Sequence, residues 1–167
     1  MKGFNRRIYH SVSGFVVDLR AILAERSQMR ALMRGESIDA GFRERLMLAV
    51  TAVNGCRYCS YAHARQALAA GMHSDEVRAL QDGVLEESPK EERLALLYAQ
   101  HWAETGGHVD PVARERILEV YDQEAVEAIE LALRTIQMGN LVGNTMDYAL
   151  YRLSFGRLKG STEEEDA

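Results

Sequence analysis

Three residues in the stretch NGCRYCSYAH, residues 54–63, could carry chemistry: Cys56, Cys59 and His63. They are the only two cysteines of the chain and one of its five histidines. Their spacings of three and four residues place the three side chains along one face of a helix. Two thiols at this separation can close a disulfide with a small adjustment, and a thiol beside an imidazole can act as a nucleophile. The sequence therefore predicts redox, nucleophilic or metal chemistry at this point.

The backbone around these residues favours a reactive thiol. Gly55 ends a helix that begins near Asp39, and a second helix can begin at or near Cys56. The first turn of a helix offers free N–H groups and the positive end of the helix dipole, which favour a thiolate. This argument makes Cys56 the more acidic thiol. His63 lies one turn beyond Cys59 and can exchange a proton with it.

Zinc binding and inert burial are the competing interpretations. Zinc accepts cysteine and histidine, but a structural site has four ligands and the chain has no second CxxC or HxxxH pair. His10, His73 or Glu44 could complete a site only by an accident of the fold. Ser60 excludes a c-type haem, because that motif has histidine directly after the second cysteine. Two inert core cysteines would be ordinary, but the CxxC spacing with a following histidine disfavours them. We therefore expect no metal and no cofactor.

The elements that position the trio are predicted to be helices. Apolar residues recur at helical spacing, and no run alternates convincingly with a period of two. We expect roughly six to eight helices, no sheet and an all-α fold. Helix starts and stops are predicted at Ser74 and Gly83, at Ser88 and the pair Gly106–Gly107, and at Asp110, with a long C-terminal helical region from Ile129.

Length and composition fit a globular protein of one domain. The 167 residues are 47% hydrophobic and 27% charged, and we expect a single domain over residues 1–160 followed by an acidic, frayed tail over 161–167. The net charge of −5 gives neither the basic surface that nucleic-acid binding needs nor attraction to anionic membranes. We expect no signal peptide and no transmembrane helix, and a cytoplasmic location.

A fourth residue extends the pattern. Glu44 precedes Cys56 by eleven intervening residues, and the spacing Glu44, Cys56, Cys59, His63 resembles the E-x11-C-x2-C-x3-H motif of the AhpD-like alkylhydroperoxidases, within the carboxymuconolactone decarboxylase superfamily. The resemblance covers residues 40–80. The later segment GNLVGNTMDYALYRL also looks like the C-terminal segment of that family.

The resemblance implies a helical bundle that assembles as trimers or hexamers and a CxxC that cycles between dithiol and disulfide. It implies that Cys59 attacks a hydroperoxide, that Cys56 resolves the sulfenic acid, and that His63 and Glu44 move protons. The expected reductant is an external dithiol, with a lipoyl group on a carrier protein as the family precedent. Tyr58 stands where the family's alkylhydroperoxidase has a histidine, which leaves the substrate open.

Two other functions compete with an antioxidant peroxidase. The first is lactone decarboxylation, as in the namesake of the superfamily, whose chemistry does not call for a CxxC. The second is a non-catalytic redox sensor, which would form the disulfide without turning over peroxide. The two arguments about the cysteines also diverge, because the helix start favours Cys56 as the more acidic thiol and the resemblance makes Cys59 the attacking one.

Overall fold

The helix that carries Glu44 runs through the middle of the molecule. In the computed structural model, which describes residues 4, 6–108 and 110–154, α3 spans Ala40–Asn54, and ten of its 15 residues are buried. Asp39 caps it by accepting the N–H of Phe42 at 3.0 Å. Gly55 ends it with a φ of 68°, in the left-handed region that glycine adopts without strain. The predicted start near Asp39 and stop at Gly55 are confirmed.

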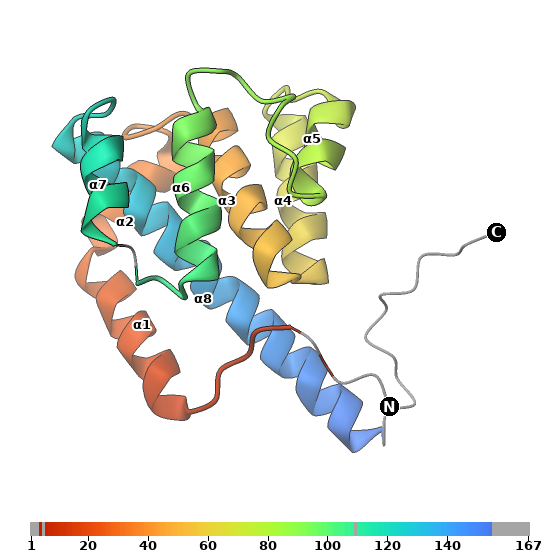
Figure 1. Ribbon diagram of the computed structural model, residues 1–167. Coiled ribbons are helices and arrows are strands. Elements are labelled where there is room, and N and C mark those ends of the chain that lie inside the picture. The colour runs from red at the N-terminus through yellow and green to blue at the C-terminus, as the bar shows by residue number, and fades with distance from the viewer. Residues whose placement is uncertain (1–3, 5, 109, 155–167) are drawn as a thin grey trace.

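The fold is all-helical, as predicted, and the described residues contain no strand. Four helices surround α3, and they are α4, α5, α6 and α8 (Figure 1). The elements other than α3 are α1 (Val12–Ala24), α2 (Arg26–Arg34), α4 (Arg57–Ala69), α5 (Ser74–Gln81), α6 (Arg93–Glu104), α7 (Pro111–Leu118) and α8 (Gln123–Leu153).

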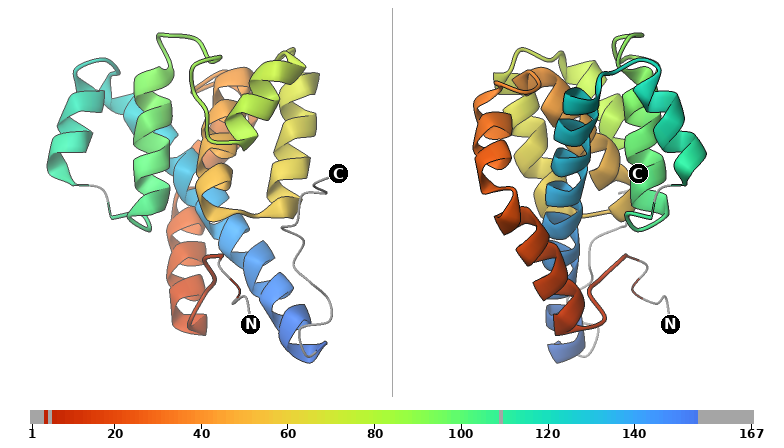
Figure 2. Two further views of the ribbon diagram at one scale, coloured as in Figure 1. Left: turned by 45° about the vertical axis from the view of Figure 1, so that its right-hand side comes forward. Right: turned by 90° about the vertical axis from the view of Figure 1, so that its left-hand side faces the viewer.

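One hydrophobic core joins these helices into a single domain. It contains fully buried leucines and isoleucines from α2, α3, α6 and α8, among them Leu32, Leu46, Leu96 and Ile129. The lower part of α8 and the adjacent α1 extend beyond this core (Figure 2). The acidic tail predicted for 161–167 lies outside the described residues, as does the end of the domain predicted at residue 160.

The predicted helix starts were right where a local cap forms and wrong where tertiary contacts intervene. Asp110 caps α7 by accepting the N–H of Ala113 at 2.9 Å. The predicted start at Ser88 is wrong, because α6 begins at Arg93. Arg93 donates to the Ser88 carbonyl at 3.0 Å, and Glu92 pairs with Arg45 of α3 at 3.3 Å, which holds this segment in turns. The start of α5 was predicted to within one residue: Ser74 is the first residue of the helix, and His73 is the N-cap.

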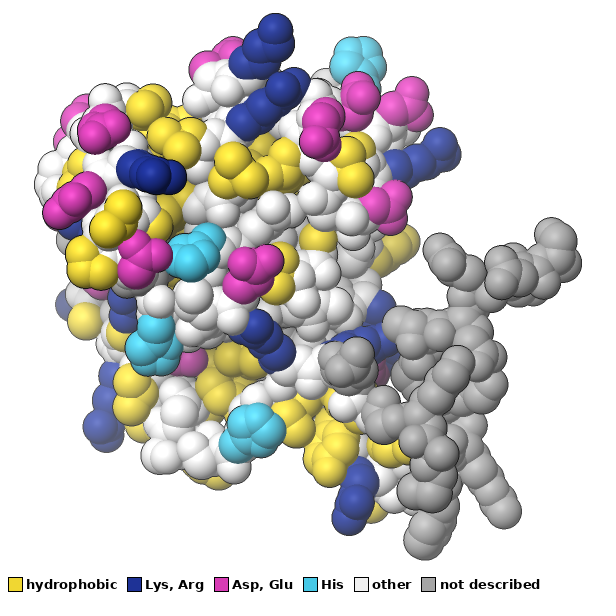
Figure 3. Space-filling model, in the orientation of Figure 1, with side chains coloured by type: hydrophobic (Ala, Val, Ile, Leu, Met, Phe, Trp, Pro, Cys, Tyr) yellow, Lys and Arg dark blue, Asp and Glu magenta, His cyan; other side chains and the backbone are white. Residues whose placement is uncertain are grey.

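The longest helix, α8, carries charged residues along its length. Among the residues that the structure describes, neither α8 nor any other helix is both long and apolar enough to cross a lipid bilayer. On the face shown in Figure 3, acidic, basic and hydrophobic side chains are interspersed.

Candidate active site

The cysteine pair lies where α3 turns into α4. Cys56 is the N-cap of α4, and its Sγ accepts the N–H of Cys59 at 3.3 Å. The two cysteines form a disulfide, with their Cα atoms 5.4 Å apart. Cys56 is 1% exposed, whereas Cys59 is only partly buried. Cys59 is therefore the more accessible of the two residues.

Glu44 and His63 meet beside this pair. Glu44 Oε2 lies 2.7 Å from His63 Nδ1, so α3 and α4 are joined by a direct side-chain contact. A hydrogen on Nδ1 makes this contact a hydrogen bond to the carboxylate, and Nε2 is then the ring nitrogen left for proton exchange. His63 follows Cys59 by one helical turn on the same face of α4. The structure thus joins Glu44 to His63 and Cys56 to Cys59, and it places His63 one turn from Cys59 on α4.

Arg43 fixes the other side of the Glu44 carboxylate. Its Nε and Nη2 donate to Glu44 Oε1 at 3.1 and 3.0 Å, and its Nη1 donates to the carbonyls of Leu32 and Met33, both at 3.0 Å. Glu44 is 1% exposed, so this ion pair and the histidine contact compensate the cost of burying its charge. The carboxylate is therefore held in one orientation towards His63.

The arrangement has the groups needed to move a proton to and from the thiol of Cys59. A carboxylate that orients an imidazole, which in turn serves a thiol one turn away, is the general pattern of an activated nucleophile. Cys56, at the N-cap, lies at the positive end of the α4 dipole, where a thiolate is stabilised. The site can therefore support both attack by one thiol and departure of the other as a thiolate.

Gly143 of α8 packs closely against the disulfide. A Cβ placed on Gly143 would lie 2.8 Å from Cys56 Sγ, closer than a carbon and a sulfur can approach without a shift. Tyr58 Cδ2 and Cys59 Sγ lie 3.8 and 3.9 Å from the same point. The absence of a side chain at residue 143 therefore lets α8 pack directly against the sulfurs.

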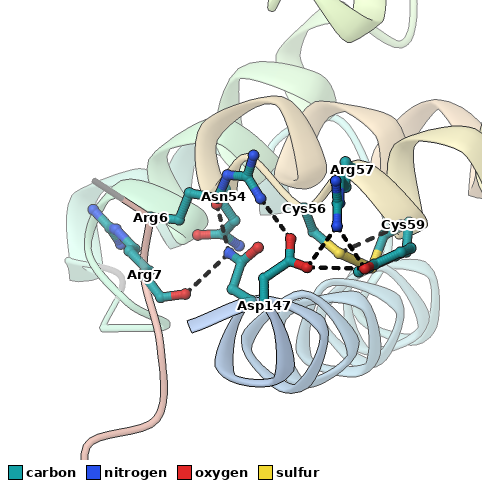
Figure 4. A network of polar contacts seen from close by, with 9 residues as sticks. Arg6, Arg7, Asn54, Cys56, Arg57, Cys59 and Asp147 are labelled. Atoms are coloured by element: carbon teal, nitrogen blue, oxygen red, sulfur yellow. Dashed lines mark hydrogen bonds and ion pairs between the residues drawn. A yellow bond between two sulfur atoms is a disulfide. The ribbon is translucent and has the colours of Figure 1, made fainter. Parts of the chain in front are cut away.

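Asp147, one turn further along α8, holds the two residues between the cysteines. Its Oδ1 accepts from Arg57 Nη2 and from Tyr58 Oη, both at 2.9 Å, and its Oδ2 accepts from Arg6 Nη1 at 2.7 Å (Figure 4). Asp147 is 4% exposed. The hydrogen bond with Tyr58, followed by the contacts with Asp147, raises the pKa of Arg57 against the opposing effect of burial.

The helical core that holds this site has known relatives. Residues 21–101 match the sequence profile of the carboxymuconolactone decarboxylase family. None of the curated proteins compared with the chain matches it. The resemblance expected from the motif is confirmed at the level of the superfamily that contains the AhpD-like proteins.

The family match contains Glu44, both cysteines and His63, but it ends before α8 begins. Gly143 and Asp147 therefore lie outside it. Sequence reasoning missed both residues, because a glycine and an aspartate within a long helical run carry no signal of their own. The only hint was that GNLVGNTMDYALYRL looks like the family's C-terminal segment, and that resemblance stays a prediction.

The N-terminal segment completes the surroundings of the site. The carbonyls of Arg7 and Asn54 both accept from Asn144 Nδ2, at 3.0 and 2.8 Å. Arg6 Cγ lies 3.5 Å from where a Cβ of Gly55 would be. The turn between α3 and α4 is thus clamped between α8 and the residues just before α1. Within the described ranges, no three His, Cys, Asp or Glu side chains are grouped as metal ligands would be.

Proposed function

We propose that the protein is an AhpD-like, thiol-dependent peroxidase that reduces organic hydroperoxides through the Cys56–Cys59 pair. The observation that carries the proposal is the 2.7 Å contact between Glu44 and His63, one helical turn from a CxxC disulfide. A structural disulfide needs no oriented imidazole beside it, whereas a thiol nucleophile does. Membership of the carboxymuconolactone decarboxylase family is consistent with this activity.

The oxidative half of the cycle begins on Cys59, the less buried of the two cysteines. The Cys59 thiolate attacks one peroxide oxygen, the O–O bond breaks, and the alkoxide takes a proton from His63, which gives an alcohol and a Cys59 sulfenic acid. Cys56 then attacks the Cys59 sulfur, the S–O bond breaks, and the hydroxide leaves as water after taking a proton. The peroxide is reduced by two electrons, and the two thiols become one disulfide. Glu44 keeps the His63 ring in the orientation that both proton transfers need.

The reductive half requires an external dithiol. Its thiolate attacks Cys59 Sγ, the Cys56–Cys59 bond breaks, and the electron pair leaves on Cys56, where the N-cap position stabilises the thiolate. The second thiol of the reductant then displaces Cys59 and closes its own disulfide. A lipoyl group on a carrier protein is the reductant we propose, in the cytoplasm, where thiols are kept reduced.

Turnover with a defined peroxide and a defined dithiol tests this function. The purified protein is reduced, freed of reductant and given one equivalent of cumene hydroperoxide. Its thiols are counted before and after, and peroxide consumption is then followed with excess dihydrolipoamide. We expect two thiols to be lost per chain and peroxide consumption to continue until the dithiol is exhausted. Loss of two thiols without turnover would instead indicate a redox sensor, and thiols that do not react would overturn the proposal.

Lactone decarboxylation is the second candidate, and the name of the matched family favours it. Release of CO₂ from carboxymuconolactone distinguishes the two. Decarboxylation that survives replacement of both cysteines by serine would favour the second candidate, because that chemistry uses no dithiol. The disulfide beside Glu44 and His63 leads us to expect no such activity.

We also propose that the chain works as a trimer or hexamer. Large apolar side chains are exposed on α1 and on the projecting part of α8, with Val12 78%, Met146 62% and Leu153 78% exposed. Burial of such surfaces between protomers is a common basis of symmetric assembly. Sedimentation equilibrium gives the number of protomers directly, and a monomer at micromolar concentration would contradict the proposal.

A further inference from the structure

The residues between the two cysteines are tied to a carboxylate that the oxidation cycle does not use. Tyr58 and Arg57 both donate to Asp147 Oδ1 at 2.9 Å. The Arg57 guanidinium also donates to Tyr58 Oη at 2.7 Å, and its carbon lies 4.7 Å from the centre of the Tyr58 ring. Tyr58, Arg57 and Asp147 are therefore three mutually bonded side chains directly beside the disulfide.

Asp147 is the fixed end of this group. Its side chain is 2% exposed, and its second oxygen pairs with Arg6, whose side chain is 11% exposed. Figure 4 shows Asp147 between Arg6 and Arg57, with Cys56 and Cys59 drawn on either side of Arg57. Tyr58 itself is 49% exposed. An exposed ring of this kind would sample several rotamers in water, so its position beside the sulfurs depends on the bond to the buried carboxylate.

The Tyr58 ring and both sulfurs lie close to the backbone of Gly143. Cys56 Sγ, Tyr58 Cδ2 and Cys59 Sγ are the three atoms nearest to the point where a Cβ of Gly143 would lie. The α8 backbone and the tethered ring therefore both border the sulfurs. Cys56, the N-cap of α4, is 1% exposed.

We propose that Asp147, through Tyr58 and Arg57, determines which sulfur of the disulfide an incoming thiolate attacks. The inference rests on the proposed function, in which an external thiol reduces the Cys56–Cys59 bond. With the ring held, a thiolate forms its new bond with Cys59, the S–S bond breaks, and Cys56 leaves with the electron pair. With the ring free, the same reagent can bond to Cys56 and displace Cys59 instead. Asp147 is thus a positioning residue for the site.

The attacked sulfur can be identified in a single reaction step. The oxidised protein is mixed with glutathione, quenched in acid after a short time, and its free thiol is blocked with N-ethylmaleimide. Trypsin cleaves after Arg57 and separates the two cysteines, so mass spectrometry reports which one carries glutathione and which one the blocking group. The variants are Asp147→Ala, Asp147→Asn, Tyr58→Ala and Tyr58→Phe.

Glu130→Ala is the matched control. Glu130 also lies on α8, and its Oε1 accepts from a tyrosine and an arginine, Tyr98 at 2.7 Å and Arg114 at 2.9 Å. That group repeats the chemistry of the Asp147 group between α8, α6 and α7, away from the disulfide. It therefore reports the general effect of removing such a carboxylate from α8.

We expect glutathione on Cys59 in the parent and in Glu130→Ala. The preference for Cys59 should fall about tenfold in Asp147→Ala and Tyr58→Ala, which is the size expected when a charged hydrogen bond is lost. Tyr58→Phe keeps the ring but loses the hydrogen bond to Asp147. Its preference for Cys59 should therefore lie between those of the alanine variants and that of the parent. Since Tyr58 is half exposed, its variants should fold even if Asp147→Ala does not.

The outcomes separate this inference from the proposed function. Glutathione on Cys59 in every folded variant, with the parent's preference, would overturn the inference and leave the peroxidase proposal standing. A parent disulfide that glutathione and dithiols fail to open would overturn the proposed function first. Asp147→Asn keeps an acceptor for Tyr58, so a preference closer to that of the parent than to Asp147→Ala is expected.

Discussion

Glu44 Oε2 and His63 Nδ1 lie 2.7 Å apart, although 19 residues separate them in the sequence. The left-handed turn at Gly55 folds α4 back along α3 and makes the contact possible. Arg43 holds the opposite carboxylate oxygen, so the imidazole meets an acceptor that cannot rotate away. The position of His63 relative to Cys59 is therefore set by the buried core and not by a surface loop.

Glu44→Gln, His63→Gln and the double variant test this contact. Each single change should lower peroxide turnover about a hundredfold, which is typical of the loss of a general acid–base group. The double variant should lose little more than the worse single one, because the two residues act as a unit. Initial rates of peroxide consumption with excess dihydrolipoamide give all four values.

Glu76→Gln is the control for loss of an ion pair on α3. Arg45 Nε lies 2.6 Å from Glu76 Oε1, so this change also removes a partly buried pair from the same helix. It should lower the unfolding temperature without a hundredfold loss of rate. Additive losses in the Glu44 and His63 variants would show that the two side chains do not cooperate.

The two cysteine-to-serine variants should lose peroxide consumption in different ways. Cys59→Ser removes the attacking sulfur and should abolish peroxide consumption. Without added dithiol, Cys56→Ser should consume one equivalent and keep a sulfenic acid on Cys59, because no second protein thiol resolves it. Dimedone labelling, read by mass spectrometry, identifies that sulfenic acid. Turnover by Cys59→Ser at the rate of the parent would reverse the assignment of the two roles.

The sequence was informative where structure and chemistry are local. Asp39 and Gly55 mark the two ends of α3, as predicted. The spacing of Cys56, Cys59 and His63 placed these three residues on one helix face. The start of α6 was misplaced at Ser88 because the contact between Arg45 and Glu92 is tertiary.

The contacts of Gly143 and Asp147 with the site could not be predicted, because these contacts are tertiary as well. Asp147 lies 90 residues from Arg57, and no periodic pattern links two such distant positions. Which residue of a long helix faces a given site depends on how the helix crosses its neighbours. The sequence does not specify that crossing, so Gly143 and Asp147 emerged only from the fold.

The Asp110 cap should make stability depend on pH in the acid range. The Ala113 N–H, and then the contact with His101, lower the pKa of the Asp110 carboxyl below its ordinary value. A carboxyl whose pKa is lowered by folding stabilises the native state above its unfolded pKa, and this contribution is lost as pH falls through the folded pKa. Asp110→Ala should therefore lower the urea midpoint at neutral pH but have a smaller effect in acid. An equal loss at both pH values would exclude the charged cap as the cause.

Gly143→Ala tests the close contact between α8 and the disulfide. The new Cβ would lie 2.8 Å from Cys56 Sγ, so the sulfur must move. A free thiol can rotate away, whereas a disulfide fixes the sulfur, and the oxidised form should bear most of the cost. Overpacking costs about 1–3 kcal/mol, and for a two-electron couple this raises the reduction potential by about 20–60 mV. Equilibration with glutathione buffers measures the shift.

Gly139→Ala is the control on the same helix, one turn earlier. A Cβ at Gly139 meets nothing within 4 Å, so the potential should not change. The protein should even gain about 0.5–1 kcal/mol of stability, because alanine is the better helix former. If both variants shifted the potential alike, the effect would come from helix propensity in α8. A shift confined to Gly143→Ala would instead place the α8 backbone in direct contact with the reacting sulfur, through a residue beyond the matched family region.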